Sequence, residues 1–259
     1  MQTWTFEHDR SLTFPVAEGR SRAHRPGVRL LRDAIQVGMR AVLRTYTRLE
    51  VVGRENLPLD RSFVMICNHS SHLDAVCLLA SLPLPRVHDA FPVAAADYFF
   101  STRLRSVLST IAVNALPVER HNGDGVEVCR RLLAKSKTVL IIFPEGTRTC
   151  SGSLGRFRSG VARLVAGSDI PVVPCYLSGA FEAWPKGRSL PRPGVLRLRI
   201  GRPRTFPDVV SVDRTAVAGI SAQLRDEVIA LRERVEGYAA APFGRRSDSG
   251  SRASISSSE

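Results

Sequence analysis

Lysine is scarce in this chain of 259 residues: only three of its 37 basic residues are lysines, and the others are arginines. The formal net charge at pH 7 is nevertheless +13. Arginine binds phosphate and carboxylate groups through a planar fork of donors, so we expect an anionic partner. A general preference for arginine codons would explain the surplus equally well, and charge alone does not separate lipid from nucleotide or nucleic acid.

Long apolar runs are missing as well. No stretch of about 18 uncharged apolar residues occurs, so we expect no transmembrane helix. Residues 1–10 lack the apolar core of a signal segment. Any contact with a membrane is therefore expected to be peripheral.

Several motifs that carry chemistry in other proteins are absent. The five cysteines have no Cys-x-x-Cys spacing and three of them lie in apolar runs, which predicts reduced core thiols in a cytosolic protein. No Gly-x-Ser-x-Gly, P-loop or Gly-x-Gly-x-x-Gly motif follows a predicted strand, which disfavours serine hydrolases, nucleotidases and dehydrogenases. The nucleophile of a reaction is thus expected to belong to the substrate.

Apolar runs typical of strands alternate with amphipathic segments typical of helices. Strands are predicted at 49–53, 62–67, 91–96, 111–118, 138–143, 171–177 and 195–200. Helices are predicted at 72–81, 103–110, 123–135, 157–166 and 212–237. This alternation indicates an α/β fold with a mainly parallel or mixed sheet covered by helices on both faces. We divide the chain into a loosely ordered lead-in (1–26), a basic amphipathic helix (27–47), an α/β domain (48–240) and a disordered tail (241–259).

The basic amphipathic helix has two stripes. Its apolar stripe consists of Leu31, Ile35, Met39, Val42 and Tyr46. Its polar stripe consists of Arg32, Gln36, Arg40, Arg44 and Arg48. Such a helix can lie in a membrane interface with its arginines against anionic head groups. A helix that packs on its own domain and keeps its arginines in solvent would show the same pattern.

His69 and Asp74 lie between a predicted buried strand and a predicted helix. Residues five apart on one helix are about 140° out of phase, so the two can meet only if His69 precedes the helix and Asp74 lies in its first turn. Asp74 would then orient a histidine base. Asp74 would also form a capping box at the start of the helix, because Ser71-x-x-Asp74 resembles that motif. His72 is a rival base, and a metal site of His69, His72 and Asp74 would lack further ligands.

Residues 144–149 follow the clearest buried strand. Gly146 allows close approach of the backbone to a ligand, and Arg148 brings a fixed positive charge, so this loop suits a phosphate. The Glu145 carboxylate would repel a phosphate and is expected to bind a hydroxyl or hold an arginine. Arg120, after another predicted strand, is a second candidate phosphate contact, or else a solvated charge. A base beside such a loop favours acyl transfer to a phosphorylated alcohol.

Four segments resemble the signature blocks of the glycerol-phosphate acyltransferases, and in particular the 1-acylglycerol-3-phosphate (lysophosphatidic acid) acyltransferases. They are Asn68-His69-x4-Asp74, residues 113–120, Phe143-Pro144-Glu145-Gly146-Thr147-Arg148, and residues 170–179. The similarity covers roughly residues 48–205. The second block ends Glu119-Arg120 and lacks the usual glycine, which departs from the family pattern and affects the acceptor assignment.

The resemblance implies roles for these residues. His69 would be the general base and Asp74 its orienting partner. Arg120, Glu145, Gly146, Thr147 and Arg148 would bind the glycerol phosphate of the acceptor. The donor would be acyl-CoA or acylated carrier protein, with no metal or prosthetic group. Pro171 and Pro174 would shape the donor side.

The expected partners are a lysophospholipid acceptor and an anionic membrane surface, with no nucleic acid. The expected location is the inner face of the cell membrane, peripheral, in the cytoplasm. Another lysolipid acceptor, such as lyso-ornithine lipid, is the alternative with the same chemistry. A hydrolase and a non-catalytic binder of anionic lipid or nucleic acid remain as further alternatives.

Overall fold

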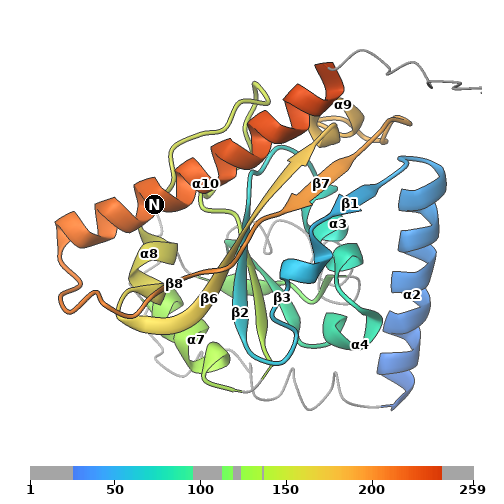
Figure 1. Ribbon diagram of the computed structural model, residues 1–259. Coiled ribbons are helices and arrows are strands. Elements are labelled where there is room, and N and C mark those ends of the chain that lie inside the picture. Colours follow the sequence, from blue (N-terminus) through green and yellow to red (C-terminus); the bar gives the residue numbers. More distant parts are fainter. Residues whose placement is uncertain (1–25, 96–112, 119–123, 136, 241–259) are drawn as a thin grey trace, which may run out of the picture.

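The computed structural model describes residues 26–95, 113–118, 124–135 and 137–240, and these confirm the predicted mixed α/β fold (Figure 1). The strands are β1 (Glu50–Val52), β2 (Phe63–Cys67), β3 (Ala90–Ala95), β4 (Leu116–Val118), β5 (Val139–Ile142), β6 (Ser168–Ser178), β7 (Arg197–Ile200) and β8 (Arg204–Phe206). The helices are α2 (Pro26–Thr45), α3 (Asp74–Ser81), α4 (Leu84–Val87), α7 (Asp124–Leu133), α8 (Gly160–Val165), α9 (Ala180–Ala183) and α10 (Arg214–Ala240), with a 3-10 turn at Arg54–Asn56.

The strands form one sheet in the order β1-β7-β6-β2-β5-β3-β4, and β8 pairs with β6. From β6 through β2, β5 and β3 to β4 all neighbours are parallel. The pairs β6–β7 and β6–β8 are antiparallel, so the sheet is mixed with a parallel majority. The parallel part matters most for function, because the carboxyl ends of its strands meet at one rim.

β2 lies at the centre of this parallel part, and its apolar run explains why. All five of its residues are fully buried, which requires cover on both faces of the sheet. Phe63, Met65 and Cys67 pack into one core, and Val64 and Ile66 into the other. The strand ends where the sequence turns polar at Asn68.

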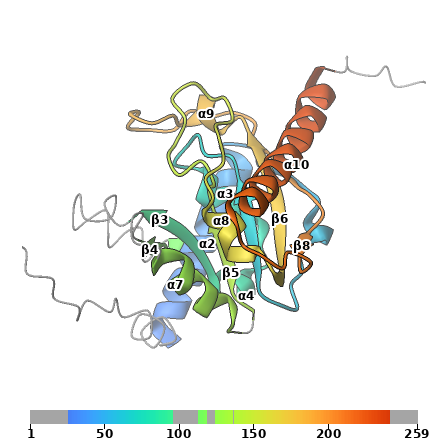
Figure 2. The ribbon, with the colours of Figure 1, turned by 90° about the vertical axis from the view of Figure 1, so that its left-hand side faces the viewer.

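Helices cover the two faces in separate layers (Figures 1 and 2). Residues of α2, α3, α4 and α9 share a core with one face of β2. Residues of α7, α8 and α10 share the second core with the other face. α10 crosses its face diagonally, as the view in Figure 1 shows.

Some predictions fall outside the described residues or need adjustment. The predicted helix at 103–110, nearly all of the lead-in and the tail 241–259 lie outside the described residues. β8 was not predicted, because Arg-Thr-Phe has no apolar run that would mark a strand. α3 begins at Asp74 rather than at residue 72, since the two residues before it form a turn.

The helix predicted at 27–47 is present as α2, but part of its predicted polar stripe is buried, whereas the two predictions placed the arginines against lipid head groups or in solvent. Arg32 and Gln36 are 4% and 3% exposed. Leu30, Leu31, Val37 and Val42 are exposed, with exposed fractions between 52% for Leu31 and 71% for Leu30. Arg32 and Gln36 thus face the protein, whereas Arg29 and Arg44 are exposed and Leu43 is buried, so the helix buries a mixture of polar and apolar residues. No helix among the described residues is long and apolar enough to span a bilayer.

The buried polar face of α2 is held by specific contacts. Arg40 Nη2 donates to the carbonyl oxygens of Leu82 at 2.7 Å and of Leu79 at 3.4 Å, at the C-terminal end of α3. Asp33 pairs with Nε2 of His88 at 2.9 Å. Burial lowers the pKa of Arg32 and of Arg40. These bonds compensate for the burial of polar side chains of α2. The amphipathic pattern of the sequence alone does not predict them.

Candidate active site

The polar segments after β2 and β5 lie at the same rim of the sheet, as the sequence predicts. β2 and β5 run parallel in direct register, and the backbone N–H of Thr149 donates to the carbonyl of His69 at 2.8 Å. Asn68 fixes the end of β2, because its side-chain amide donates to Leu177 O at 2.9 Å and accepts from Leu177 N–H at 2.8 Å. Arg120, the candidate after β4, lies outside the described residues.

His69 and Asp74 meet in the way that their spacing allows. Nδ1 of His69 lies 2.8 Å from Oδ2 of Asp74, and the ionised carboxylate can only accept, so Nδ1 carries the proton. The basic lone pair is then on Nε2. The side chain of His69 is 22% exposed, and its ring stacks on Phe143 with centroids 4.0 Å apart and 14° between the planes. This contact and Asp74 fix the ring in one orientation.

Asp74 is fully buried and also builds the corner that holds His69. Its Oδ2 accepts hydrogen bonds from the backbone N–H of Ser70 at 2.7 Å and of Ser71 at 2.8 Å. The N-cap of α3 is Leu73 and makes no side-chain cap bond, so the predicted capping box at Ser71 does not form. Ser71 Oγ accepts from Leu73 N–H. Asp74 therefore contacts His69 and fixes the backbone of the turn before α3 at the same time.

Glu145 faces the backbone rather than the open part of the site. Its Oε1 accepts from the N–H of His69 and its Oε2 from the N–H of Gly155, each at 2.8 Å. Burial raises the pKa of Glu145, and the two backbone hydrogen bonds oppose that effect. The sequence suggested a hydroxyl or an arginine as its partner, but the carboxylate joins the corner after β2 to the loop after β5.

Glu145→Gln is expected to loosen His69, because an amide offers one acceptor where two backbone donors need one each. The lost bond should lower the free energy of unfolding by about 1–3 kcal/mol. Displacement of His69 should also lower kcat by about tenfold or more. Denaturant unfolding and turnover measured on the same preparation check both effects; unchanged turnover in a destabilised protein would show that Glu145 does not position His69.

Gly146 holds a turn that other residues would strain. Its φ is +74°, and a Cβ built there would lie 2.7 Å from Nε of Arg158. Arg158 in turn donates from Nε to the carbonyl of Glu145 at 3.2 Å. The turn presents Thr147 and Arg148 to the same cavity as His69.

A cavity of about 1480 Å³ adjoins His69 and has two kinds of wall. Its apolar wall includes Met39, Ala75, Val76, Pro92, Val93, Val113, Val118, Val126, Ile142, Val161 and Leu164. Its cationic side chains are Arg148, Arg156, Arg158, Arg163 and Lys186. Glu145 is the acidic residue among the described residues that line it. The cavity therefore suits an anionic molecule with an aliphatic chain.

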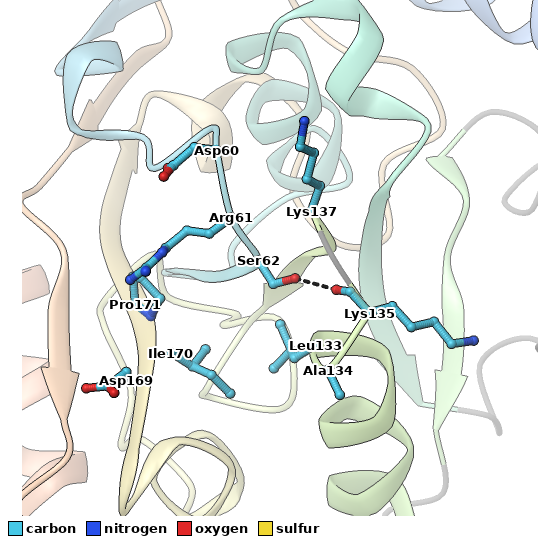
Figure 3. A pocket seen from close by; sticks show the side chains of 10 residues that line it. All are labelled: Asp60, Arg61, Ser62, Leu133, Ala134, Lys135, Lys137, Asp169, Ile170 and Pro171. Carbon is cyan, nitrogen blue, oxygen red and sulfur yellow. Dashed lines mark hydrogen bonds between the residues drawn. The ribbon is translucent and has the colours of Figure 1, made fainter.

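A second, smaller pocket of about 380 Å³ lies at the opposite ends of β2, β5 and β6 (Figure 3). Asp60 and Asp169 line it together with Arg61, and Figure 3 shows Lys135 and Lys137 pointing in different directions. Its charges are mixed, and the part of the predicted signature segments that reaches it is Ile170 and Pro171.

The two prolines assigned to the donor side do not lie at the large cavity. Pro171 lines the small pocket of Figure 3. Pro174 is buried in β6 beside Ile66, and its carbonyl accepts from Gly201 N–H at 2.7 Å. Neither is among the described residues that line the cavity at His69.

The cysteines fit the prediction of core thiols. Four of the five are buried, and Cys150 is exposed. Burial raises the pKa of Cys129 to about 12, and it also raises the pKa of Cys67, Cys77 and Cys175. These buried thiols therefore remain protonated near neutral pH and supply no thiolate nucleophile.

Comparison with known proteins connects this geometry to a family. The family model described as Acyltransferase matches residues 48–178, just over half of the chain and the whole of both polar loops. A 1-acyl-sn-glycerol-3-phosphate acyltransferase of Bacillus subtilis (strain 168) is 25% identical over 200 residues, which cover 76% of this chain and 95% of that protein. The alpha form of that enzyme from Mus musculus is 27% identical over 177 residues, covering 66% and 60%.

A solved structure has the same fold. The 1-acyl-sn-glycerophosphate (LPA) acyltransferase PlsC from Thermotoga maritima aligns with a TM-score of 0.59 at 22% identity, covering 89% of this chain and 86% of that one. The family model, which spans His69, Asp74 and the loop after β5, shows that this chain is an acyltransferase of the glycerol-phosphate acyltransferase family.

Proposed function

We propose that the protein transfers a fatty acyl group from acyl-CoA or acyl carrier protein to the free hydroxyl of 1-acylglycerol 3-phosphate, giving phosphatidic acid. The observation that supports this most is the placement of His69, paired with Asp74, on a cavity that combines cationic side chains with apolar walls. The acceptor has both features, a phosphate and an acyl chain. The relatives from Bacillus subtilis and Mus musculus are named for the same acceptor.

The proposed reaction needs one proton carrier and no protein nucleophile. Nε2 of His69 takes the proton of the acceptor hydroxyl as the oxygen attacks the thioester carbonyl. The carbon–sulfur bond then breaks, and the thiolate leaves with the proton that His69 holds. An ester and a free thiol result. Asp74 keeps Nδ1 protonated and stabilises the imidazolium that forms between the two steps.

The phosphate is proposed to bind Arg148 and the backbone turn at Gly146 and Thr147, with Arg120 as a further contact. A guanidinium binds a phosphate through two parallel hydrogen bonds, which fixes orientation as well as charge. Glu145 stabilises this site by accepting hydrogen bonds from the backbone N–H groups of His69 and Gly155. It need not contact the acceptor itself. The acyl chains would occupy the apolar part of the cavity.

The acceptor is tested by a panel of lysolipids offered with one acyl-CoA. We expect the enzyme to form phosphatidic acid from 1-acylglycerol 3-phosphate. The kcat/KM for this acceptor should exceed that for lyso-ornithine lipid by at least about tenfold. A higher kcat/KM for the phosphate-free lipid would overturn the acceptor while leaving the acyltransferase chemistry intact.

Asp74→Asn is expected to reduce kcat by about 10²–10⁴-fold, because a neutral amide no longer stabilises the imidazolium of His69. The Asn oxygen can still accept from Ser70 and Ser71, so the corner should survive. Steady-state kinetics should show the lower kcat, and the thermal unfolding temperature of the variant should equal that of the wild type. If kcat falls only in proportion to the fraction of the variant that is unfolded, Asp74 does not orient His69.

We further propose that the protein binds the inner face of the cell membrane peripherally through α2. Its outward face carries Leu30, Leu31, Val37 and Val42, and exposed apolar patches of this kind mark interaction surfaces. Met39 of the same helix lines the cavity at His69. A lipid acceptor could thus pass from the bilayer to the cavity beside this helix.

A further inference from the structure

His72, two residues before α3, contacts Arg148 rather than the catalytic pair. Nη1 of Arg148 lies 2.9 Å from Nδ1 and 2.5 Å from Nε2 of His72. A guanidinium only donates, and a neutral imidazole offers one acceptor nitrogen, so Nη1 can bond to only one of the two ring nitrogens at a time. The Oδ2 atom of Asp74, which orients His69, is used by His69, Ser70 and Ser71. His72 therefore has the geometry of an acceptor for Arg148 and not that of a second base.

Trp184, directly after α9, also contacts the ring of His72. The two rings lie 5.2 Å apart with 47° between their planes. The Trp184 indole N–H donates to Arg188 O at 2.8 Å, and its own carbonyl accepts from Ser71 Oγ at 2.8 Å. Ser71 and Pro185 also form an isolated β-bridge. Trp184 is thus fixed to the same corner that carries His72.

The three side chains line the large cavity beside His69. His72, Arg148 and Trp184 all line it, and Lys186, two residues after Trp184, lines it too. A free arginine side chain carries about 2 kcal/mol of rotamer entropy that phosphate binding would have to overcome. A guanidinium already held by His72 loses less of that freedom when the phosphate binds.

We propose that His72 is a positioning residue that holds Arg148 for the acceptor phosphate and thereby makes the enzyme prefer phosphorylated over phosphate-free acceptors. This inference rests on the proposed function. It assigns to a histidine outside the His69–Asp74 pair a role in acceptor recognition and none in proton transfer. Loss of His72 should consequently raise the KM for the phosphorylated acceptor and leave the chemical step alone.

The test compares His72→Phe with His72→Gln in the full-length protein. Phenylalanine keeps an aromatic ring against Trp184 but accepts no hydrogen bond, whereas glutamine restores an acceptor. His72→Phe is expected to raise the KM for 1-acylglycerol 3-phosphate by about tenfold, with kcat and the KM for acyl-CoA within about twofold of wild type. The KM for 1-acylglycerol, which has no phosphate, should stay the same. His72→Gln should recover most of the lost affinity.

A double-mutant cycle separates positioning from simple packing. In an Arg148→Ala background, His72→Phe should have no further effect on the KM for the phosphorylated acceptor. Equal KM values for wild type and His72→Phe, or equal rises for both acceptors, would overturn the inference. If the wild-type protein shows no preference for the phosphorylated acceptor, the proposed function fails instead. Titration calorimetry with glycerol 3-phosphate gives an independent readout, and His72→Phe should bind it about tenfold more weakly than wild type.

Discussion

His69→Ala is expected to reduce kcat for acyl transfer by about 10³-fold or more, because the acceptor hydroxyl loses the group that takes its proton. The KM for the acyl donor should change little, since no proposed donor contact depends on the imidazole. Initial rates of thiol release at saturating acceptor and donor measure the effect. A variant that keeps a tenth or more of the wild-type kcat would refute His69 as the base.

His69→Asn is the matched control, since the alanine variant also removes the ring that stacks on Phe143 and the donor that bonds to Asp74. An asparagine amide can still donate to the Asp74 carboxylate, but it has no basic nitrogen. Both variants should be equally inactive if the missing base is the cause. An asparagine variant near wild-type activity would show that His69 is needed only to keep the corner intact.

Replacing three exposed residues of α2 by glutamine (Leu30→Gln, Val37→Gln and Val42→Gln) is expected to weaken vesicle binding by about tenfold or more. Burial of each such side chain in an apolar phase is worth about 1.5–3 kcal/mol, so even partial insertion of three gives a large change. Glutamine is a good helix former, and the buried Arg32 and Gln36 are left in place. Co-sedimentation with phosphatidylglycerol-containing vesicles measures the partition.

Val210→Gln is the matched control for the vesicle experiment. Val210 is 99% exposed and lies outside α2, between β8 and α10. Its replacement should leave vesicle binding at the wild-type level. Equal binding by the wild type and the triple variant would exclude the outward face of α2 as the membrane contact. Deletion of the whole helix would be less informative, because it would also expose the core at Leu43.

The central strand and the corner that brings His69 to Asp74 could be predicted because the sequence features that mark them lie close together in the chain. Five consecutive apolar residues mark β2 as buried on both faces, and a polar stretch marks its end. The spacing of Ser71 and Asp74 predicts a helix start in this stretch, which allows His69 and Asp74 to meet, although the helix begins at Asp74 and its N-cap is Leu73 rather than Ser71. Each inference uses residues within a few positions of one another.

The orientation of α2 could not be predicted, because periodicity defines two faces without saying which one is buried. Arg32 and Gln36 are buried, while the end of α3 offers carbonyls to Arg40 and His88 contacts Asp33. Those partners are distant in the sequence. The contact between His72 and Arg148 could not be predicted for the same reason, because the two residues are 76 positions apart in the sequence. It also hides the use of Glu145, whose partners are backbone N–H groups without any sequence signature.

The most direct test of the proposed reaction is to measure thiol release and phosphatidic acid together, with and without 1-acylglycerol 3-phosphate. If His69 activates a substrate hydroxyl, thiol is released only when the acceptor is present, and one phosphatidic acid forms for each thiol. Thiol release at the same rate without the acceptor, with free fatty acid as the product, would contradict this reaction and show that water takes the acyl group.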